Sequence, residues 1–320
     1  MFMVEVTMPT DDAKQILFIL SVKAGNGKSL GLSRRIQAIY AAAGAGDRVE
    51  ILLTQHGDHA YDAAAAFADT YGENGIVFIC GGDGSSSEVA NALANTDCAM
   101  GVLPFGTAND FSKILYTKKE SKDFDGLLQR TLTPTIRKID AIYFNGRYAL
   151  NVISFGFDTI VLQNALKIMR RLPFVGSTGY AFGVVMSLFS KKKFPVAITW
   201  VDEHGAEHTL EKTMVLSAIG NGRYYGNGFQ PSPNAELDDG LLDFSFAEAM
   251  SFFSFISLIK RYRQGTHAGH PKIHVGRGTR GTIRPRAPLT SIFGNSDGII
   301  FDEAELHFEV ARDAINFACI

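Results

Sequence analysis

The most constraining stretch of the sequence is an apolar run at residues 76–80 that leads directly into Gly-Gly-Asp-Gly at residues 81–84 and three serines at residues 85–87. The apolar run predicts a short buried strand. The glycines predict a tight turn, and any of the three serines could cap the helix that follows. A strand, a glycine turn and a helix N-terminus together favour a phosphate site, because free N–H groups and the helix dipole attract oxyanions.

Asp83 is an unexpected residue within such a turn. A carboxylate beside a phosphate repels it unless a cation lies between the two. Asp83 is therefore predicted to act through Mg²⁺ or on a proton. From this stretch alone, a purely structural Asx-turn explains the same residue equally well.

Composition excludes several classes of protein. The 320 residues are 46% hydrophobic and 20% charged, which is typical of a globular chain with room for about two domains. A formal net charge of -2 argues against a nucleic-acid binder that works by bulk charge. Cys80, Cys98 and Cys319 lack metal-ligand spacing and no export signal is visible, so we expect a cytoplasmic protein. No apolar run reaches the roughly 18 residues of a membrane span, so membrane contact is expected to be peripheral.

Residues 1–137 are predicted to form an α/β domain. Strands are expected at residues 15–20, 48–53 and 76–80, and helices at residues 30–43, 58–71 and 88–93. Their alternation with short connections indicates a mostly parallel sheet, in which ligands bind at the carboxyl ends of the strands. A further strand and Pro/Gly turn precede Thr107, Asn109 and Asp110, which we expect to face the same cleft as Asp83.

Residues 138–303 show a different pattern, with short alternating segments separated by turns, and predict a mainly β domain. Strands are expected at residues 141–144, 148–154, 196–201, 213–219 and 241–246, and helices around residues 159–171 and 180–189. Residues 304–320 alternate again, and we predict that they return to the first domain. An exposed strand edge in the β domain would allow two chains to pair as a homodimer.

Five blocks resemble the diacylglycerol kinase catalytic domain family, which includes bacterial lipid kinases and the sphingosine and ceramide kinases. They are Gly-Gly-Asp-Gly-Ser at 81–85, Gly-Thr-Ala-Asn-Asp-Phe at 106–111, Asn-Gly-Arg-Tyr-Tyr-Gly at 221–226, Leu-Asp-Asp-Gly at 237–240 and Asn-Ser-Asp-Gly at 295–298. The blocks follow the family's order along nearly the whole chain. The resemblance implies an NAD-kinase-like α/β domain, a β-sandwich domain, and ATP-dependent phosphorylation of a lipid hydroxyl in the cleft between them. Diacylglycerol is the default acceptor by this resemblance, and sphingoid bases, ceramide and monoacylglycerol stay open as acceptors.

The resemblance also implies roles for individual residues. The nucleotide is expected to bind Gly81, Gly82, Gly84, Ser85, Gly106, Thr107, Asn109 and Asp110. Mg²⁺ is expected at Asp238 and Asp239, while Asp83 and Asp297 are the expected catalytic carboxylates. Because Mg²⁺ suits a sparse set of carboxylates, we expect Asp83, Asp110 and Asp239 to meet in one crevice.

Two positions depart from the family pattern. The first loop, usually Asn-Pro-x-Ser-Gly, reads Ser-Val-Lys-Ala-Gly at residues 21–25, and the glutamate that ends the family's Asp-Gly-Glu motif is Ile299. Asp302, Glu303 and Glu305 could replace that glutamate, and the spacing selects none of them. Two other interpretations therefore stay open: an NAD-kinase-like enzyme with a soluble acceptor, and a catalytically silent regulator that binds nucleotide or lipid.

Lipid access is expected through two apolar stretches with basic ends, at residues 180–193 and 252–263. Residues 251–292 contain eight Lys or Arg and no Asp or Glu, a composition that anionic lipid would attract. Core packing explains the phenylalanines of these stretches as well. We accordingly expect a lipid substrate at a membrane surface, and no nucleic acid partner.

Overall fold

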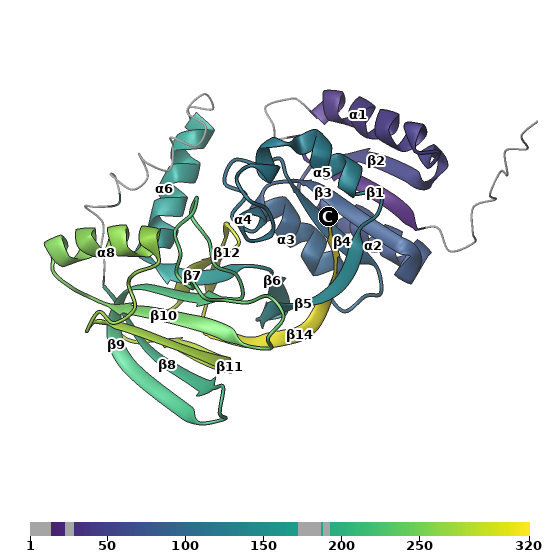
Figure 1. Ribbon diagram of the computed structural model, residues 1–320. Coiled ribbons are helices and arrows are strands. Elements are labelled where there is room, and N and C mark those ends of the chain that lie inside the picture. Colours follow the sequence, from purple (N-terminus) through teal and green to yellow (C-terminus); the bar gives the residue numbers. More distant parts are fainter. Residues whose placement is uncertain (1–13, 23–28, 172–186, 188–192) are drawn as a thin grey trace, which may run out of the picture.

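The computed structural model describes residues 14–22, 29–171, 187 and 193–320. Its N-terminal half is a parallel sheet with helices on both faces (Figure 1). The strands are β1 (Gln15–Leu20), β2 (Val49–Leu53), β3 (Gly75–Gly81) and β4 (Ala99–Pro104), in the spatial order β2-β1-β3-β4. The helices are α1 (Ser29–Ala42), α2 (His59–Tyr71), α3 (Asp83–Leu93), α4 (Ser112–Leu115) and α5 (Phe124–Arg130), with short 3₁₀ turns at Gly46–Arg48, Gly72–Asn74 and Glu120–Lys122.

Alternation along the buried strands divides this half into two cores. Leu17 and Ile19 of β1 pack with α2 and α3. Phe18 and Leu20, which point to the other face, pack with Ile36 of α1 and with α5. Both faces of a parallel sheet are covered in this way, and its strands are accordingly apolar throughout. The predicted α/β domain with a parallel sheet is confirmed.

The second half is an antiparallel, sandwich-like domain, as predicted. Its strands are β5 (Thr135–Phe144), β6 (Arg147–Ala149), β7 (Val152–Gly156), β8 (Phe194–Asp202), β9 (Glu207–Gly220), β10 (Leu242–Glu248), β11 (Ile273–Pro285), β12 (Ile292–Ser296) and β13 (Ile299–Glu303). A core rich in Ile and Phe, including Ile153, Phe244 and Phe308, fills the space between the strands. The helices α6 (Phe157–Arg171) and α8 (Phe252–Gln264) lie beside these strands (Figure 1). The helix expected at residues 180–189 falls almost entirely outside the described residues.

One long strand, β14 (Leu306–Cys319), joins the two halves (Figure 1). Its first part pairs with β11, its whole length follows β5, and near its end Asn316 and Phe317 pair in parallel with Ala99 and Met100 of β4. The final residues of the chain therefore lie in the sheet of the N-terminal half, and the two halves share a continuous hydrogen-bonded sheet.

The start of α3 differs from the sequence-based expectation. The helix begins at Asp83, directly after Gly82, so none of the three serines caps it. Ser86 and Ser87 are buried within the helix, and the Ser86 hydroxyl donates to the Gly82 carbonyl at 3.2 Å. The turn is therefore shorter than predicted, and it places Asp83 itself among the free N–H groups of the helix N-terminus.

Candidate active site

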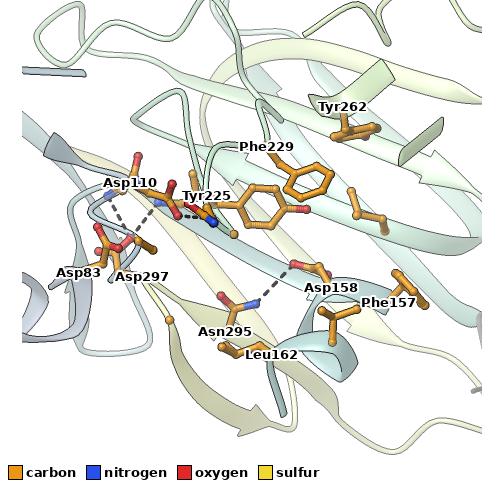
Figure 2. A pocket seen from close by; sticks show the side chains of 18 of the residues that line it. Asp83, Asp110, Phe157, Asp158, Leu162, Tyr225, Phe229, Tyr262, Asn295 and Asp297 are labelled. Atoms are coloured by element: carbon orange, nitrogen blue, oxygen red, sulfur yellow. Dashed lines mark hydrogen bonds between the residues drawn. The ribbon is translucent and has the colours of Figure 1, made fainter. Parts of the chain in front are cut away.

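A cavity of about 670 Å³ lies between the two halves of the chain (Figure 2). One end is polar and is formed by the β3–α3 turn, the loop after β4 and the turn after β12. The other end is apolar and lies between α6 and α8. The polar end includes Gly82, Asp83, Gly84, Thr107, Asp110, Asn151 and Asp297, and the apolar end includes Phe157, Val161, Leu162, Leu166, Leu216, Phe255, Leu258 and Ile259.

The glycines at the polar end permit two loops to touch. A Cβ added to Gly106 would lie 2.3 Å from the Gly82 Cα, so any larger residue would push the loops apart. In contrast, a Cβ added to Gly84 would have no atom within 4 Å, so Gly84 faces open space. The first turn of α3 thus presents free backbone N–H groups to the cavity, an arrangement that fits phosphate oxygens.

Asp83 and Asp110 meet at this end, as the sequence predicted. Asp83 Oδ1 accepts a hydrogen bond from the Phe111 N–H at 3.1 Å. Burial, and then the nearby charge of Asp110, raise the pKa of Asp83 to about 6, while the Phe111 N–H acts in the opposite direction. A carboxyl group with a pKa close to neutral suits proton acceptance at physiological pH.

Asp110 connects the two halves across the cavity. One oxygen accepts from Lys113 Nζ at 2.6 Å and the other from the Asn227 N–H at 2.7 Å. Arg263 of α8 in turn donates to the Asn227 carbonyl at 2.5 Å. Asn227 has a positive φ of 66°, between two glycines that also have positive φ, which shapes the turn that reaches Asp110.

Asp297 joins the same group of carboxylates from the C-terminal half (Figure 2). It and Gly298 form the tight turn between β12 and β13, with φ values of 48° and 87°. Its Oδ2 accepts from the Leu150 N–H at 2.7 Å, and its Oδ1 accepts from the N–H groups of Asn151 and Val152 at 3.2 and 2.9 Å. Burial raises the pKa of Asp297 to about 7, although these three donors oppose the rise.

Four of the residues predicted to bind the nucleotide do not line the cavity: Gly81, Ser85, Gly106 and Asn109. The side chain of Ser85 lies against Gly81, where an added Cβ would be 2.9 Å from the serine Cβ. Asn109, at a φ of 51°, closes its loop by accepting from the Gly106 N–H at 2.8 Å and donating to the Gly106 carbonyl at 3.0 Å. These residues shape the loops, whereas Gly82, Asp83, Gly84, Thr107 and Asp110 line the space itself.

The expected convergence of Asp83, Asp110 and Asp239 is wrong, because neither Asp238 nor Asp239 lines the cavity. Asp239 pairs with Arg277, and Asp238 pairs with Arg137 at 3.1 Å. The buried Asp140 carboxylate fixes this turn by accepting from the Gly240 N–H at 2.7 Å.

Asp297 takes the place that was expected for Asp239. A metal role for Asp238 and Asp239 stays a prediction. Among the described residues, no three His, Cys, Asp or Glu side chains gather closely enough to hold a metal ion.

Among the described positions that depart from the family pattern, Ser21, Val22 and Ile299 do not line the cavity. Of the first loop, only Ser21 and Val22 are described; residues 23–25 fall outside. Ile299 is 44% exposed at the start of β13. Among its suggested replacements, Glu303 pairs with Arg147 and Glu305 with Arg284, and neither these two nor Asp302 lines the cavity.

Sequence reasoning missed a second polar group, which lies along the cavity toward the apolar end (Figure 2). Asp158, in the first turn of α6, accepts from the Ser154 hydroxyl and from Asn295 Nδ2, the latter at 3.4 Å. Tyr225 extends between this group and the carboxylates at the polar end. The signal that could have revealed Asp158 is its place as the only acidic residue of the helical segment 157–171, in the first turn directly after a buried strand.

The chemistry of the site fits a nucleotide held with a cation. Free N–H groups at the start of α3 suit phosphate oxygens, but Asp83 and Asp110 would repel a bare polyphosphate. Hard, oxygen-preferring Mg²⁺ would remove that repulsion, and two carboxylates are a sufficient protein contribution for an ion that retains water ligands. None of the described helices has the length and apolarity required to cross a bilayer.

Comparison with known proteins agrees with this geometry. Residues 15–144 match the diacylglycerol kinase catalytic domain, and residues 151–319 match the YegS C-terminal NAD kinase beta sandwich-like domain. A Pseudomonas aeruginosa protein named "Probable lipid kinase YegS-like" is 30% identical over 237 residues, which cover 73% of this chain and 72% of that one. A Mycobacterium tuberculosis protein named "Diacylglycerol kinase" is 28% identical over 275 residues, or 83% and 86% of the two chains.

The fold is also known from crystal structures. A structure titled as a diacylglycerol kinase from Bacillus anthracis superposes with a TM-score of 0.68 over 96% of this chain and 97% of the other, at 21% identity. That likeness concerns the fold, while the two domain matches and the sequence relatives identify the family. The chain belongs to the family of YegS-like and diacylglycerol kinase-like lipid kinases.

Proposed function

We propose that the protein transfers the terminal phosphoryl group of ATP to the hydroxyl group of a lipid, with Asp83 as the proton acceptor. The observation that supports this proposal is the cavity itself, which joins a carboxylate-lined polar end to an apolar end between α6 and α8. A soluble acceptor such as NAD would leave that apolar space without a function. ATP would supply the phosphoryl group when bound, and Mg²⁺ would add positive charge to that of Lys113 beside Asp110 and of Arg263 in the cavity wall.

The residues of the chain would position and activate the acceptor. The start of α3 would hold phosphate oxygens through backbone N–H groups, and Asp83 would accept the proton of the attacking hydroxyl. Asp297, held by three backbone donors, is fixed beside Asp83 and contributes to its negative surroundings. The apolar side chains of α6 and α8 would take up the hydrocarbon part of the lipid and exclude water.

We also propose that α8 brings the cavity to an anionic membrane surface. On its outer side Phe253 is 84% exposed, Phe252 is 51% exposed and Ile256 is 40% exposed, while Phe255 and Leu258 on the inner side line the cavity. The exposed Lys260 and Arg261 of α8 give this surface a charge that anionic lipid attracts, whereas Arg277, Arg284 and Arg286 of the same basic stretch are paired with carboxylates.

A kinase assay with labelled ATP and separate lipid and NAD acceptors tests the proposed reaction. We expect label in the lipid phase, and we expect Asp83→Asn to reduce turnover about 10²–10⁴-fold, because the proton acceptor is removed. Nucleotide affinity measured without Mg²⁺ should not fall in that variant, because the Asp83 carboxylate repels a bare polyphosphate. Label confined to the aqueous product would reject the lipid acceptor. Nucleotide binding without turnover of any acceptor would instead favour a silent regulator.

A further inference from the structure

One of the two carboxylate oxygens of Asp110 is held by a turn from the other half of the chain. Its Oδ1 accepts from Lys113, three residues along, whereas its Oδ2 accepts at 2.7 Å from the N–H of Asn227, 117 residues along. Asp110 is only 4% exposed, so these donors fix the orientation of its carboxylate. The turn at residues 225–229, hereafter the Asn227 turn, therefore sets the direction in which Asp110 faces the cavity.

The Asn227 turn is not fixed by its own backbone. Gly226, Asn227 and Gly228 have φ values of 55°, 66° and 95°, and glycines on both sides of Asn227 allow many other conformations. The hydrogen bonds within the turn run from the N–H groups of Gly228 and Phe229 to the Tyr225 carbonyl, at 3.1 and 2.8 Å. They leave the N–H and the carbonyl of Asn227 to partners outside the turn, and those partners select the conformation that reaches Asp110.

The last turn of α8 supplies the partner of the Asn227 carbonyl. Arg263 donates to that carbonyl at 2.5 Å, and its guanidinium carbon lies 5.3 Å from the centroid of the Phe229 ring. The same end of α8 also binds the residue after the turn: the Gln230 N–H donates to the Tyr262 carbonyl at 2.8 Å, and Gln230 Nε2 donates to the Arg263 carbonyl at 3.2 Å. A chain of contacts thus runs from α8 through Asn227 to Asp110.

We propose that Arg263 is a positioning residue of the nucleotide site: it holds the Asn227 turn, and through the Asn227 N–H it holds Asp110 in the orientation that receives nucleotide-bound Mg²⁺. The donors that orient a metal-binding carboxylate strongly affect the affinity for the metal, even though they do not touch it. Arg263 lies outside the five sequence blocks, on the helix whose inner side lines the apolar end of the cavity. This inference rests on the Mg²⁺-dependent kinase activity proposed above and adds a residue to its nucleotide site.

Two substitutions disturb the Asn227 turn in different ways. Arg263→Met removes the donor and keeps a long side chain. Gly228→Ala changes no charge; its Cβ has room, because the nearest atom lies at 3.7 Å, but a φ of 95° is strained for alanine. Two controls match these changes. Arg280→Met removes an exposed arginine of β11, and Gly269→Ala changes a glycine with a φ of 82° and nothing within 4 Å of an added Cβ. Neither control residue lines the cavity.

Calorimetry with a non-hydrolysable ATP analogue, with and without Mg²⁺, measures the effect on variants whose melting temperatures show that they are folded. We expect Arg263→Met and Gly228→Ala each to weaken binding of the Mg²⁺-loaded analogue about tenfold, and both controls to keep the native affinity. The double variant should also lose about tenfold, because both changes act through one turn. Arg263→Lys, which keeps a donor, should lose less than Arg263→Met. Without Mg²⁺, Gly228→Ala should bind the analogue as the native protein does, because Asp110 acts through the cation.

The outcomes separate this inference from the proposed activity. If Arg263→Met binds the Mg²⁺-loaded analogue as tightly as Arg280→Met does, the inference fails while the lipid kinase activity stands. Losses that multiply to about a hundredfold in the double variant also overturn it, because Arg263 then acts on the nucleotide independently of the turn. An equal loss for Gly228→Ala with and without Mg²⁺ overturns the role of Asp110. If the native protein binds no nucleotide, the proposed activity fails and the inference fails with it.

Discussion

Asp158→Asn should make the protein more stable at neutral pH, and the gain should disappear in acid. Burial raises the pKa of Asp158 from 3.8 to about 6, because the partial compensation by Ser154 and Asn295 does not offset the loss of hydration. The titratable groups that face it are Tyr225 and Tyr262, whose pKa values are also raised by burial, so both are neutral. In the described part of the chain, hydrogen bonds from Ser154, Asn295 and two backbone N–H groups oppose the rise in the Asp158 pKa.

The sign follows from proton binding. A carboxyl group whose pKa is raised by folding binds a proton more tightly in the folded state than in the unfolded state. The contribution of Asp158 therefore lowers the free energy of unfolding as pH rises from about 4 to about 6, and this loss is constant above that range. A rise of about two pKa units corresponds to about 3 kcal/mol, which an amide that never ionises would recover.

Urea unfolding at a series of pH values measures this effect. Trp200 is the only tryptophan and lies on β8 against Phe244 and Phe246, so its fluorescence reports the same half of the chain as Asp158. The difference in unfolding free energy between variant and native protein should grow from near zero at pH 4 to about 3 kcal/mol at pH 7.5. At a slope of roughly 3 kcal/mol/M, this is a midpoint shift of about 1 M urea.

Asp202→Asn is the control with the opposite sign. The hydrogen bonds from His208 and from the Ala206 N–H lower the pKa of Asp202 to about 2, so its stabilising effect is present near neutral pH and fades as pH falls. The control should therefore be less stable than the native protein at neutral pH, with the difference shrinking in acid. If the difference in unfolding free energy between Asp158→Asn and the native protein does not change with pH, the reasoning is refuted. Ionisation of Asp158 would then not destabilise the folded protein.

Three further predictions concern the loops, the carboxylates and α8. Gly106→Ala should weaken nucleotide binding at least about tenfold, because its Cβ would lie 2.3 Å from the Gly82 Cα; native affinity by calorimetry would show that the loops need not touch. Asp297→Asn should remove the stability loss that the native protein shows as pH rises from about 4 to about 7, because the buried carboxyl group whose pKa is raised to about 7 can no longer ionise; an unchanged pH dependence of urea unfolding would contradict this. Replacing Phe252 and Phe253 together by Ser should reduce sedimentation with anionic vesicles about tenfold or more, whereas Tyr61→Ser, an exposed aromatic of the other half, should not; equal losses would argue against docking through α8.

The N-terminal half was predictable in detail because its signals are local. The alternation of apolar strands with amphipathic helices indicated the parallel sheet, and the glycine turn before α3 indicated residues that do line the cavity. The start of α3 was mispredicted by a few residues because three consecutive serines are strong capping candidates. Packing buries Ser86 and Ser87 instead and leaves the helix to begin at Asp83.

The C-terminal half showed where sequence reasoning loses information. Asp239 and Asp297 are both acidic residues in glycine turns, and the motifs alone did not show which of them reaches Asp83. Asp140 and Arg277 fix the first turn outside the cavity, while three backbone N–H groups hold Asp297 within it. Asp158 was not singled out, because an acidic residue in the first turn of a helix is ordinarily a favourable surface residue.

The sequence by itself determined the glycine turns and carboxylates that line the polar end of the cavity, their order along the chain and the two fold classes, because backbone geometry and apolar periodicity depend on near neighbours. The tertiary structure decided which carboxylates share a cavity and which acquire ion-pair partners elsewhere. Those outcomes depend on contacts between segments more than a hundred residues apart, such as Asp110 with Asn227 and Leu150 with Asp297, and on burial, which turns an ordinary aspartate such as Asp158 into one whose charge has a cost.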